Sequence, residues 1–423
     1  MAERTTFFIF TTGCKANQWD SHVLAAGLRQ AGLVASSMSR ADVIVINACS
    51  LTGRAETDAR QFVLRSRRTN PGAKVALVGC HAQAYPDRAF GADLVLGQGE
   101  KFDFTRYLSG TGRFVSETRK FGVEKAPAEN GRKERTRFFF KVQDGCDRFC
   151  TYCVVPYARG NSRSRPASEI AAFMTGLKGQ GVKEVVLTGI DLGTYHDPAL
   201  GGGLNELLLF LEDLDTPPRL RLSSVDPRCL DDDFISLLAR SRKLAKSIHI
   251  PVQSGSDRIL RAMGRGYDAA FITDVVAELV RRVGNIGIGI DLMAGFPGED
   301  EEAFNETCDL AETLEVSYFH VFPYSEREGT KASAFPGKVA EAAKRARVAA
   351  LKRMDARKRE AFAMRHLGER VRIIPEGKLY GGRLMRGFSD NYLPVYIPYE
   401  KTLENNLVEV TIRGMEGSRV IGG

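Results

Sequence analysis

The sequence predicts a multidomain α/β protein with two blocks of parallel strands and a small β-barrel at its C-terminal end. Three observations support this fold class. Strand and helix patterns alternate twice along the chain, a stretch without apolar periodicity separates the two blocks, and the last residues change to short β-rich runs. Alternating β and α elements form parallel sheets covered by helices. A chain of 423 residues with 43% hydrophobic residues can build two or three such domains.

The first block, residues 1–108, predicts a doubly wound parallel sheet. Runs rich in apolar and β-branched residues indicate strands, and the segments between them have helical spacing. The expected strands are 5–14, 42–49, 74–80 and 93–96, and the expected helices are 17–31 and 56–68. In residues 109–136 the periodicity fails and Gly, Ser, Lys, Arg and Glu dominate, which indicates a linker or a long surface loop.

The second block, residues 137–337, predicts an open, partial (β/α)6 barrel. Six β/α units fall short of the eight that close a complete barrel, and the site of such a fold lies at the carboxyl ends of its strands. The expected strands are 138–143, 184–189, 219–224, 247–253, 287–294 and 318–324, with helices such as 271–283 and 301–314 between them.

The last two segments are a basic helix and a β-rich domain. Residues 338–365 have helical spacing and carry ten Lys or Arg against three acids. Residues 366–423 hold short β-rich runs at 370–374, 393–397 and 407–412, separated by Gly and Asn turns. These runs predict a small antiparallel β-barrel similar to an oligonucleotide-binding fold. The formal net charge of +8 permits a nucleic-acid partner, although charge that serves solubility alone is an alternative for the helix.

Composition excludes several other classes. No apolar run approaches the ~20 residues that span a bilayer, and no signal-peptide pattern opens the chain, so we expect a cytoplasmic monomer with no membrane partner. Eight cysteines are too few for a disulfide scaffold, which a reducing cytosol would not keep oxidised. Metal binding or catalysis is the interpretation left for the cysteines.

Three cysteines lie close together directly after the first strand of the second block. Cys146, Cys150 and Cys153 have the spacing C-x3-C-x2-C, and no other Cys or His lies nearby. A structural zinc site needs a fourth protein ligand, whereas an iron–sulfur cube can be held by three thiolates and keep one iron open. The triad therefore predicts a cluster, with zinc or three unrelated buried thiols as alternatives.

Three further cysteines end successive strands of the first block. Cys14, Cys49 and Cys80 are about 30 residues apart, but the carboxyl ends of neighbouring parallel strands meet at one edge of a sheet. One such residue would be explained as a buried thiol. Three in succession predict a second metal cluster with three ligands. Cys229 and Cys308 are expected to be bystanders.

The first triad, with Tyr152 just before its third cysteine, resembles the radical S-adenosylmethionine (SAM) superfamily. The segments Thr12-Gly13-Cys14, Asn47-Ala48-Cys49 and 78–83 resemble the N-terminal domain of the methylthiotransferases, whose C-terminal β-barrel is the TRAM module, so the resemblance covers essentially the whole chain. It implies SAM and two [4Fe–4S] clusters as cofactors. One cluster would cleave SAM to a radical that removes hydrogen from an unactivated C–H, the auxiliary cluster would carry sulfur, and a second SAM would methylate that sulfur.

The segment 319–330, together with Gln143-Asp144-Gly145, is similar to the branch that acts on N6-threonylcarbamoyladenosine next to the tRNA anticodon. This resemblance implies the tRNA anticodon stem-loop as substrate, an electron donor such as a flavodoxin or ferredoxin, and a sulfur donor. The branches acting on isopentenyladenosine or on a ribosomal-protein aspartate stay open. So does an RNA-binding protein with structural zinc or an electron-transfer cluster. His320 is given no catalytic role, because a lone His on a strand is more often a core residue.

Candidate contact residues follow from the strand ends and from the loop after the first triad. Glycines at strand ends let a ligand approach the backbone, and polar side chains there can bind ribose or carboxylate groups. The SAM candidates are Gly189, Asp191, Gln253, Ser254 and Gly295, and Tyr152 is expected to back the cluster or to pack on adenine, with ordinary loop packing as the alternative. Arg159, Arg163 and Arg165 are expected to bind phosphate or an anionic base modification, with a solvated loop as the alternative.

Overall fold

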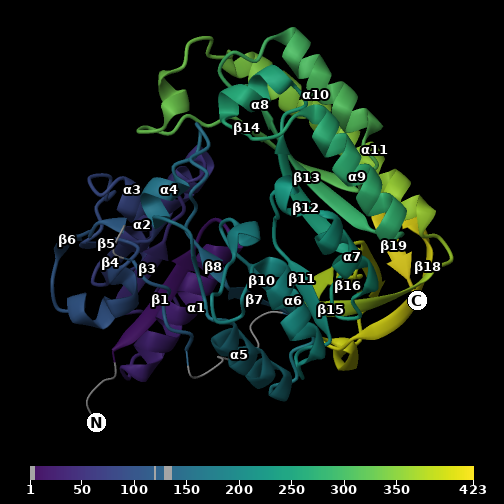
Figure 1. Ribbon diagram of the computed structural model, residues 1–423. Helices are drawn as coiled ribbons and strands as arrows, with labels where there is room; N and C mark the ends of the chain where they lie inside the picture. The colour runs from purple at the N-terminus through teal and green to yellow at the C-terminus, as the bar shows by residue number, and fades with distance from the viewer. Residues whose placement is uncertain (1–4, 119–120, 128–135) are drawn as a thin grey trace.

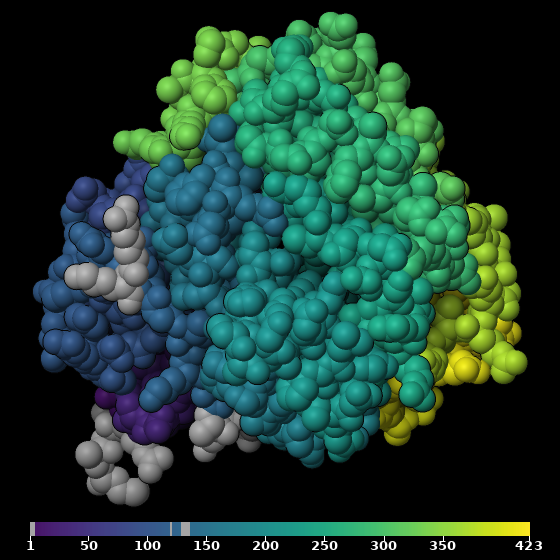
Figure 2. Space-filling view, in the orientation of Figure 1, coloured from purple at the N-terminus to yellow at the C-terminus, as the bar shows by residue number. Residues whose placement is uncertain are grey.

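A computed structural model describes residues 5–118, 121–127 and 136–423. It has three parts, which follow one another along the chain and pack side by side (Figure 1). The N-terminal part, in purple and blue, lies beside a central part in teal and green, and the C-terminal part, in yellow, packs on the opposite side of the centre. Figure 2 shows that the three parts form one continuous surface on this face.

The N-terminal part is a six-stranded parallel sheet with the order β2-β1-β3-β4-β5-β6. Two apolar clusters, one around Phe7 and Leu24 and one around Ile44 and Val63, are buried against helices, as a doubly wound sheet requires. The short edge strands β2 and β6 were not expected, and β6 lies inside the range predicted as a linker. The strands are β1 (Thr6–Thr11), β2 (Val34–Ala35), β3 (Val43–Asn47), β4 (Lys74–Val78), β5 (Leu94–Leu96) and β6 (Gly112–Phe114), and the helices are α1 (Lys15–Gln30), α2 (Gly53–Thr69), α3 (Cys80–Ala84) and the 3-10 helix η1 (Glu100–Tyr107).

The central part is a partial barrel of six parallel strands. Two three-stranded sheets, β11-β10-β7 and β12-β13-β14, are joined by isolated bridges from Leu220 to Leu244 and from Ser224 to His249. No pairing between β7 and β14 is found among the described residues, so the barrel is open there. The strands are β7 (Arg137–Lys141), β10 (Glu184–Thr188), β11 (Arg219–Leu222), β12 (Ser247–Gln253), β13 (Gly287–Ala294) and β14 (Tyr318–Pro323).

Helices cover the outside of this barrel, as Figure 1 shows for α9 and α10. They bury a large apolar cluster that runs from Phe140 to Leu351. The helices are α5 (Ala167–Gly179), α6 (Leu204–Asp213), α7 (Asp232–Arg240), α8 (Asp257–Met263), α9 (Ala269–Val283) and α10 (Glu301–Thr313). Short elements complete this part: α4 (Val155–Arg159), β8 (Gln143–Asp144), β9 (Arg163–Ser164), η3 (Leu192–Thr194), η4 (Pro227–Cys229) and η5 (Lys331–Ala334).

The basic segment forms the long helix α11 (Glu341–Arg365), which leads into a closed C-terminal barrel. The order around the barrel is β15-β16-β17-β19-β18. The prediction of an antiparallel barrel is wrong for one pair, because β17 and β19 are parallel. Since β18 and β19 form a hairpin, β19 can close the barrel only by running in the direction of β17. The strands are β15 (Arg370–Tyr380), β16 (Leu384–Phe388), β17 (Pro394–Pro398), β18 (Val408–Glu416) and β19 (Arg419–Gly422), with η6 (Lys401–Leu403) before β18.

The C-terminal barrel closes the amino end of the central strands. Arg219 donates to the carbonyls of Phe388 and Arg372, and Arg221 donates to those of Ser389 and Asp390. These contacts leave the opposite, carboxyl end of the strands for the cysteines. No helix in the described part of the chain is long and apolar enough to cross a membrane.

Candidate functional site

The structure brings Cys14, Cys49 and Cys80 together at the carboxyl edge of the N-terminal sheet. Cys14 caps the start of α1, Cys49 follows β3, and Cys80 begins α3 directly after β4. Gly13 has φ +92°, and a Cβ there would lie 2.7 Å from Cys49 Sγ, so only glycine lets the two cysteines approach. Burial raises the pKa values of Cys49 and Cys80, and the charge of Cys14 raises both further. The three thiols are therefore electrostatic neighbours.

The first triad, Cys146, Cys150 and Cys153, lies on the loop between β8 and α4. Gly145 has φ +75°, and a Cβ there would overlap the carbonyl of Asn161, so glycine is required at this turn. The loop is held by hydrogen bonds from Cys146 N to Gly160 O (3.0 Å) and from Cys153 N to Cys150 O (2.9 Å). Burial raises the pKa of Cys146 to about 11 and that of Cys153 to about 12. Such thiols ionise only when a cation compensates the charge, which bound iron would do.

The sulfur spacing fits a cluster better than a single zinc ion. Three sulfurs at about 2.3 Å from one zinc would lie roughly 3.8 Å from one another. Among the described residues, the groups with three ligand atoms all within 4.8 Å are His249, Asp291 and His320, and Asp20, Glu124 and Asp144. Neither cysteine triad is as tight as that. Wider triads of thiols suit a cube of four irons, whose ligands spread around it.

Arg159 links the two triads. Its Nε donates to Cys80 Sγ at 3.2 Å, and the carbonyl of the next residue, Gly160, accepts from Cys146 N. One arginine side chain and one peptide unit therefore separate Cys80 from Cys146, a path on the order of 15 Å.

A buried ion network holds Arg159 in this position. Its guanidinium donates to Asp144 (2.8 Å), Asp20 (2.8 Å) and Asn17 (2.6 Å). Although burial raises the pKa of both carboxyls, Arg159 and the neighbouring cations hold the pKa values of Asp20 and Asp144 below their usual range. Lys101 and Lys141 complete the network through Asp20, and Lys141 also reaches Asp144. These charges join α1, η1 and β7 across the boundary between the two parts.

The arginines predicted to bind substrate instead form hydrogen bonds and ion pairs with other residues of the protein. Arg159 and Arg165 are buried, and Arg165 donates to Glu124 at 2.9 Å and to Glu169. Arg163 is half-buried and donates to Asp144 at 3.0 Å and to the carbonyl of Arg159 at 2.7 Å. In this conformation all three position the loop after the triad.

Of the predicted SAM contacts at the end of β10, Asp191 lies beside the Cys146 triad and Gly189 lies two residues before it. Asp191 is buried, and its Oδ2 lies 3.9 Å from Cys146 Sγ. Gly189 lies against Gln143, which would meet a Cβ at 2.7 Å and which accepts from the backbone N–H groups of Ile190 and Asp191. The turn after β10 therefore places Asp191 beside Cys146.

Gln253 has two features of a ligand contact. It ends β12 at φ +73°, a strained value for a residue that is not glycine, and it sits where the pairing with β13 shifts register. It is buried, and its Oε1 has no hydrogen-bond partner among the described residues. A buried amide oxygen without a partner is costly unless a ligand donates to it.

The other SAM candidates have structural partners. The Ser254 hydroxyl contacts Thr307 of α10 at 3.2 Å. Gly295, at φ +83°, lies under the Lys344 side chain and donates its N–H to Glu299 at 2.8 Å. Tyr152 packs edge-on against Phe296 in an apolar cluster, and burial raises its pKa well above the usual value. This packing favours a backing role for the Tyr152 ring.

Sequence reasoning missed two arginines beside the first triad. Arg265 Nη1 donates to Cys150 Sγ at 3.3 Å and is fixed by Asp226. Arg148 donates to Asp191 and lies 3.5 Å from Asp226. Arg148 lies inside the cysteine motif, so its position in the sequence could have predicted a place beside the triad. Arg265 is distant in sequence and carries no local signal. Arg265 places a positive charge beside the Cys150 thiol, which favours its thiolate form, and Arg148 pairs with the carboxylates next to Cys146.

Sequence reasoning also missed a polar group inside the barrel. His249 of β12, Asp291 of β13 and His320 of β14 stand on neighbouring strands, and Asp291 Oδ1 lies 2.9 Å from His249 Nε2 and 3.5 Å from His320 Nδ1. Burial would raise the pKa of Asp291, but the two imidazoles hold it below its usual range. His320, which was given no role, is therefore one of three adjacent polar residues facing the barrel interior.

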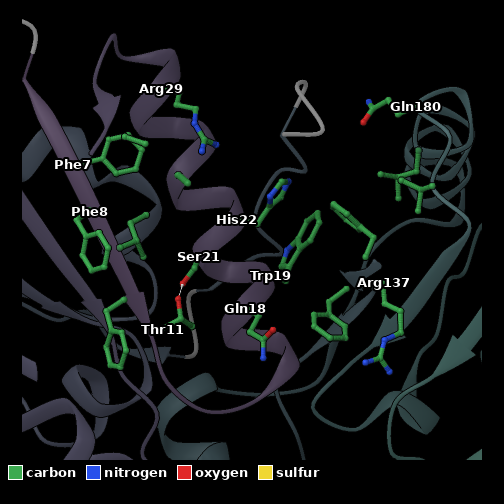
Figure 3. A pocket seen from close by; sticks show the side chains of 18 of the residues that line it. Phe7, Phe8, Thr11, Gln18, Trp19, Ser21, His22, Arg29, Arg137 and Gln180 are labelled. Carbon is green, nitrogen blue, oxygen red and sulfur yellow. Dashed lines mark hydrogen bonds between the residues drawn. The ribbon is translucent and has the colours of Figure 1, made fainter. Parts of the chain in front are cut away.

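A separate cavity lies on the other side of α1. It has a volume of about 510 Å³ and lies between β1 and α1 on one side and β7 and α5 on the other. Figure 3 shows Trp19 and His22 of α1 between Phe7 of β1 and Arg137 of β7. No cysteine lines this cavity, so it is distinct from the cluster sites.

The basic helix α11 is only partly available to a ligand. Arg347 is buried, where it donates to Glu299 at 2.7 Å, and Leu351 and Met354 pack inward. Lys344 and Lys358 are half-buried. The exposed basic residues of the segment are Lys338, Arg345, Lys352, Arg353, Arg357, Arg359 and Arg365.

Comparisons with known proteins match this layout. The pattern of the Radical SAM superfamily matches residues 140–311, and that of the uncharacterized protein family UPF0004 matches residues 6–97. Threonylcarbamoyladenosine tRNA methylthiotransferase MtaB of Bacillus subtilis (strain 168) is 32% identical, over 96% of this chain and 93% of its own. The protein of that name from Aquifex aeolicus (strain VF5) is 36% identical, over 91% and 95%.

A further relative and a solved structure show how far this similarity extends. A tRNA-2-methylthio-N(6)-dimethylallyladenosine synthase of Clostridium botulinum (strain Hall / ATCC 3502 / NCTC 13319 / Type A) is 33% identical, over 88% of this chain and 86% of its own. Among solved structures, the radical S-adenosylmethionine methyltransferase TsrM from Kitasatospora setae, with cobalamin and a [4Fe-4S] cluster bound, aligns with a TM-score of 0.60 at 16% identity, over 78% and 77% of the two chains. At that identity the likeness concerns the fold alone.

Proposed function

This chain belongs to the tRNA methylthiotransferases of the radical SAM superfamily, and from that premise we propose that it inserts a methylthio group into N6-threonylcarbamoyladenosine next to the tRNA anticodon. The MtaB relatives carry this base in their names, whereas a relative of nearly equal similarity carries dimethylallyladenosine. The name of the latter includes 2-methylthio, which supports the C2–H of adenine as the attacked bond.

The enzyme uses SAM and two [4Fe–4S] clusters. Cys146, Cys150 and Cys153 would hold the first, and Cys14, Cys49 and Cys80 would hold the auxiliary one. When bound, the first supplies the electron that cleaves SAM, and the auxiliary cluster supplies sulfur that a second SAM methylates. Three thiolates in each set leave one iron open for SAM or for sulfur.

The observation that carries the proposal is the short path between the triads. Arg159 contacts Cys80 Sγ, and the next residue contacts Cys146 N. A carbon radical must meet the sulfur before it reacts elsewhere, so the two centres have to share one pocket. The buried charges around Arg159 keep the N-terminal sheet against the barrel and exclude water from this boundary.

The remaining residues receive proposed roles from their positions. Gln253, Asp191 and Gly189 would contact SAM, and Tyr152 would back the cluster. Arg159 and Arg265 would offset the charge of the thiolates they contact, Cys80 and Cys150. An electron donor such as a flavodoxin or ferredoxin and a sulfur donor would serve the enzyme, which we expect to work as a monomer.

The tRNA would bind to α11 and to the C-terminal barrel, which we propose is TRAM-like. Seven exposed basic residues on and just before α11 offer contacts to phosphates. The barrel continues from α11 and packs on the amino end of the central strands, away from the cysteines. An RNA held along this side could extend one base toward the carboxyl end.

The test is mass spectrometry of tRNA nucleosides from a strain that lacks the gene. Loss of the methylthio form of threonylcarbamoyladenosine, restored by the wild-type gene but not by Cys14→Ala or Cys146→Ala, is expected. Loss of the methylthio form of dimethylallyladenosine instead would move the enzyme to the other branch. An unchanged nucleoside profile would contradict both.

A further inference from the structure

His249, Asp291 and His320 lie on the inward face of three neighbouring barrel strands. Asp291 pairs directly with His320, and His249 pairs with Gly289, which lies two residues before Asp291 and so on the same face. The residues beside the three in the sequence pack in the apolar cluster beneath the outer helices: Ile248, Ile250, Ile290, Leu292, Phe319 and Val321. Because side chains alternate along a strand, the polar residues point the other way. The strand pairing therefore brings two imidazoles and one carboxylate together.

The distances between these side chains are those of ligands that share one metal ion. Asp291 Oδ1 lies 2.9 Å from His249 Nε2 and 3.5 Å from His320 Nδ1. With metal–ligand bonds of about 2.1 Å, neighbouring ligand atoms lie about 3.0 Å apart in an octahedral site and about 3.4 Å apart in a tetrahedral one. The three ligand atoms all lie within 4.8 Å of one another. An ion can therefore bind between them after small side-chain movements.

His249 Nε2 gives a second, independent indication of a ligand. His249 is nine-tenths buried, and its Nε2 has no hydrogen-bond partner among the described residues, although Asp291 Oδ1 is only 2.9 Å away. The ring therefore does not point at that oxygen, as it would in a hydrogen-bonded His–Asp pair. Two ligands of one ion point at the ion and so past each other. A buried nitrogen without a partner is costly unless a ligand binds to it.

The other ring nitrogen of His249 is placed as it is in metal sites. When a histidine binds a metal, its second nitrogen donates to a nearby oxygen, which fixes the tautomer and the ring orientation. His249 Nδ1 lies 3.3 Å from Tyr318 OH, so it would donate to this hydroxyl and leave the lone pair of Nε2 for an ion. Gly289 makes this arrangement possible, because a Cβ there would lie 2.2 Å from Cζ of Tyr318.

The other group of three ligand residues, Asp20, Glu124 and Asp144, is already occupied by cations. Lys141 Nζ lies 2.5 Å from Asp20, 3.1 Å from Glu124 and 2.6 Å from Asp144. By contrast, no Lys or Arg in the described part of the chain forms an ion pair with Asp291, whose partners there are the two imidazoles. A bound cation would balance the charge of this carboxylate.

We propose that His249, Asp291 and His320 bind one divalent transition-metal ion, separate from the two iron–sulfur clusters. Two imidazoles and one carboxylate suit zinc or iron(II), and three protein ligands leave at least one position open. The His320 side chain is 57% exposed, so water or a carboxylate oxygen of a bound molecule can reach the ion from that side. The site lies four residues, or about 13 Å, before Gln253 along β12, apart from the proposed SAM contacts.

The experiment measures the zinc bound to the reconstituted full-length enzyme. The protein is equilibrated with zinc chloride and desalted, and its zinc and iron are determined by elemental mass spectrometry. Zinc binds such ligands more tightly than iron(II), so it also replaces iron(II) left from reconstitution. X-ray absorption at the zinc edge identifies the ligands, because bonds to nitrogen or oxygen of about 2.0–2.2 Å differ from bonds to sulfur of about 2.3 Å. This difference separates the proposed site from the cysteine triads.

We expect about one zinc per wild-type chain, with nitrogen and oxygen ligands, no sulfur and no loss of cluster iron. Asp291→Asn and His320→Ala should each weaken zinc binding at least about 100-fold, since loss of a residue that only orients a ligand costs about 10–100-fold. Tyr318→Phe should weaken it about tenfold. His320→Cys should keep the zinc and add one sulfur at about 2.3 Å. The matched control is His196→Ala, at an exposed histidine outside the group, which should bind zinc as the wild type does.

Two outcomes would overturn the inference. In one, the wild type retains no more zinc than His320→Ala. In the other, the zinc of the wild type has sulfur ligands, which would place it in a cysteine triad. Since the His320 side chain is largely exposed, His320→Ala tests the ligand set even if Asp291→Asn disturbs folding. A failure of the proposed function would leave these results unchanged, because none of the measurements requires tRNA.

Discussion

Replacing Arg159 by Met should loosen the N-terminal sheet from the barrel. The side chain is buried and donates to Asp20, Asp144, Asn17 and Cys80. Removing one member of a buried ion pair costs about 3–5 kcal/mol, because its partners stay buried and unpaired. That cost corresponds to roughly two to four orders of magnitude in the equilibrium for opening the boundary.

Native-state hydrogen exchange measures this opening locally, which suits a multidomain chain whose global unfolding is not two-state. The amides of α1 and α4 should exchange faster in Arg159→Met by that factor, while amides of the C-terminal barrel stay unchanged. The added substitution Asp144→Asn should recover a large share of the protection, since it removes one of the carboxylates left unpaired.

Arg88→Met is the matched control. Arg88 also crosses between the two parts, to Glu328, but its side chain is 43% exposed. An exposed pair contributes at most about 1 kcal/mol, so exchange should rise by no more than about fivefold. The reasoning fails if Arg88→Met loosens α1 as much as Arg159→Met does, or if Asp144→Asn makes the Met variant worse.

Three further predictions concern the clusters, the pH dependence of stability and the RNA. Cys14→Ala should keep about four irons per chain and still cleave SAM under reductant, whereas Cys146→Ala should keep about four irons per chain and cleave no SAM. Iron analysis and assays for 5′-deoxyadenosine check this. Equal loss of SAM cleavage in both variants would contradict the assignment. Burial, with a smaller effect from Arg29, lowers the pKa of His22 from its usual 6.5 to about 4. Because the unfolded chain then binds the extra proton, the local stability of α1 should fall as the pH drops from 6.5 to 4. His22→Phe should remove a dependence on the order of 2 kcal/mol, after a discount for partial exposure, in the free energy of opening that hydrogen exchange of the α1 amides reports. Three exposed residues of α11 form no ion pair within the described residues: Arg345, Lys352 and Arg353. Neutralising all three should reduce the slope of log K for tRNA against log salt by about 2, at about 0.7 per contact. An unchanged slope would mean that the RNA binds elsewhere.

The order of elements and the grouping of six cysteines into two sets of three were predictable because their signals are local. Strand and helix patterns depend on near neighbours, and the position of Cys14, Cys49 and Cys80 at strand ends places them on one edge in any parallel sheet. Asp191 and Gln253 follow the same rule, and the structure places Asp191 beside Cys146 and leaves the Gln253 amide oxygen without a partner among the described residues.

Other features could not be predicted, because they depend on which surfaces meet. Arg159 and Arg347 look like surface cations in the sequence, yet each is buried against carboxylates contributed by distant segments. The pairing of β17 with β19 depends on how the chain closes the barrel and not on the patterns of either strand.

The sequence by itself determined the order of the elements and the two sets of three thiols, because spacing along the chain carries that information, and its similarity to known proteins showed that the chain belongs to the tRNA methylthiotransferases. Only the tertiary structure decided that Arg159 joins the two sets, and that His249, Asp291 and His320 lie together on three neighbouring strands. The physical reason is that a charge acquires its partners from side chains brought near it by folding, and their distance in the sequence does not specify which these are.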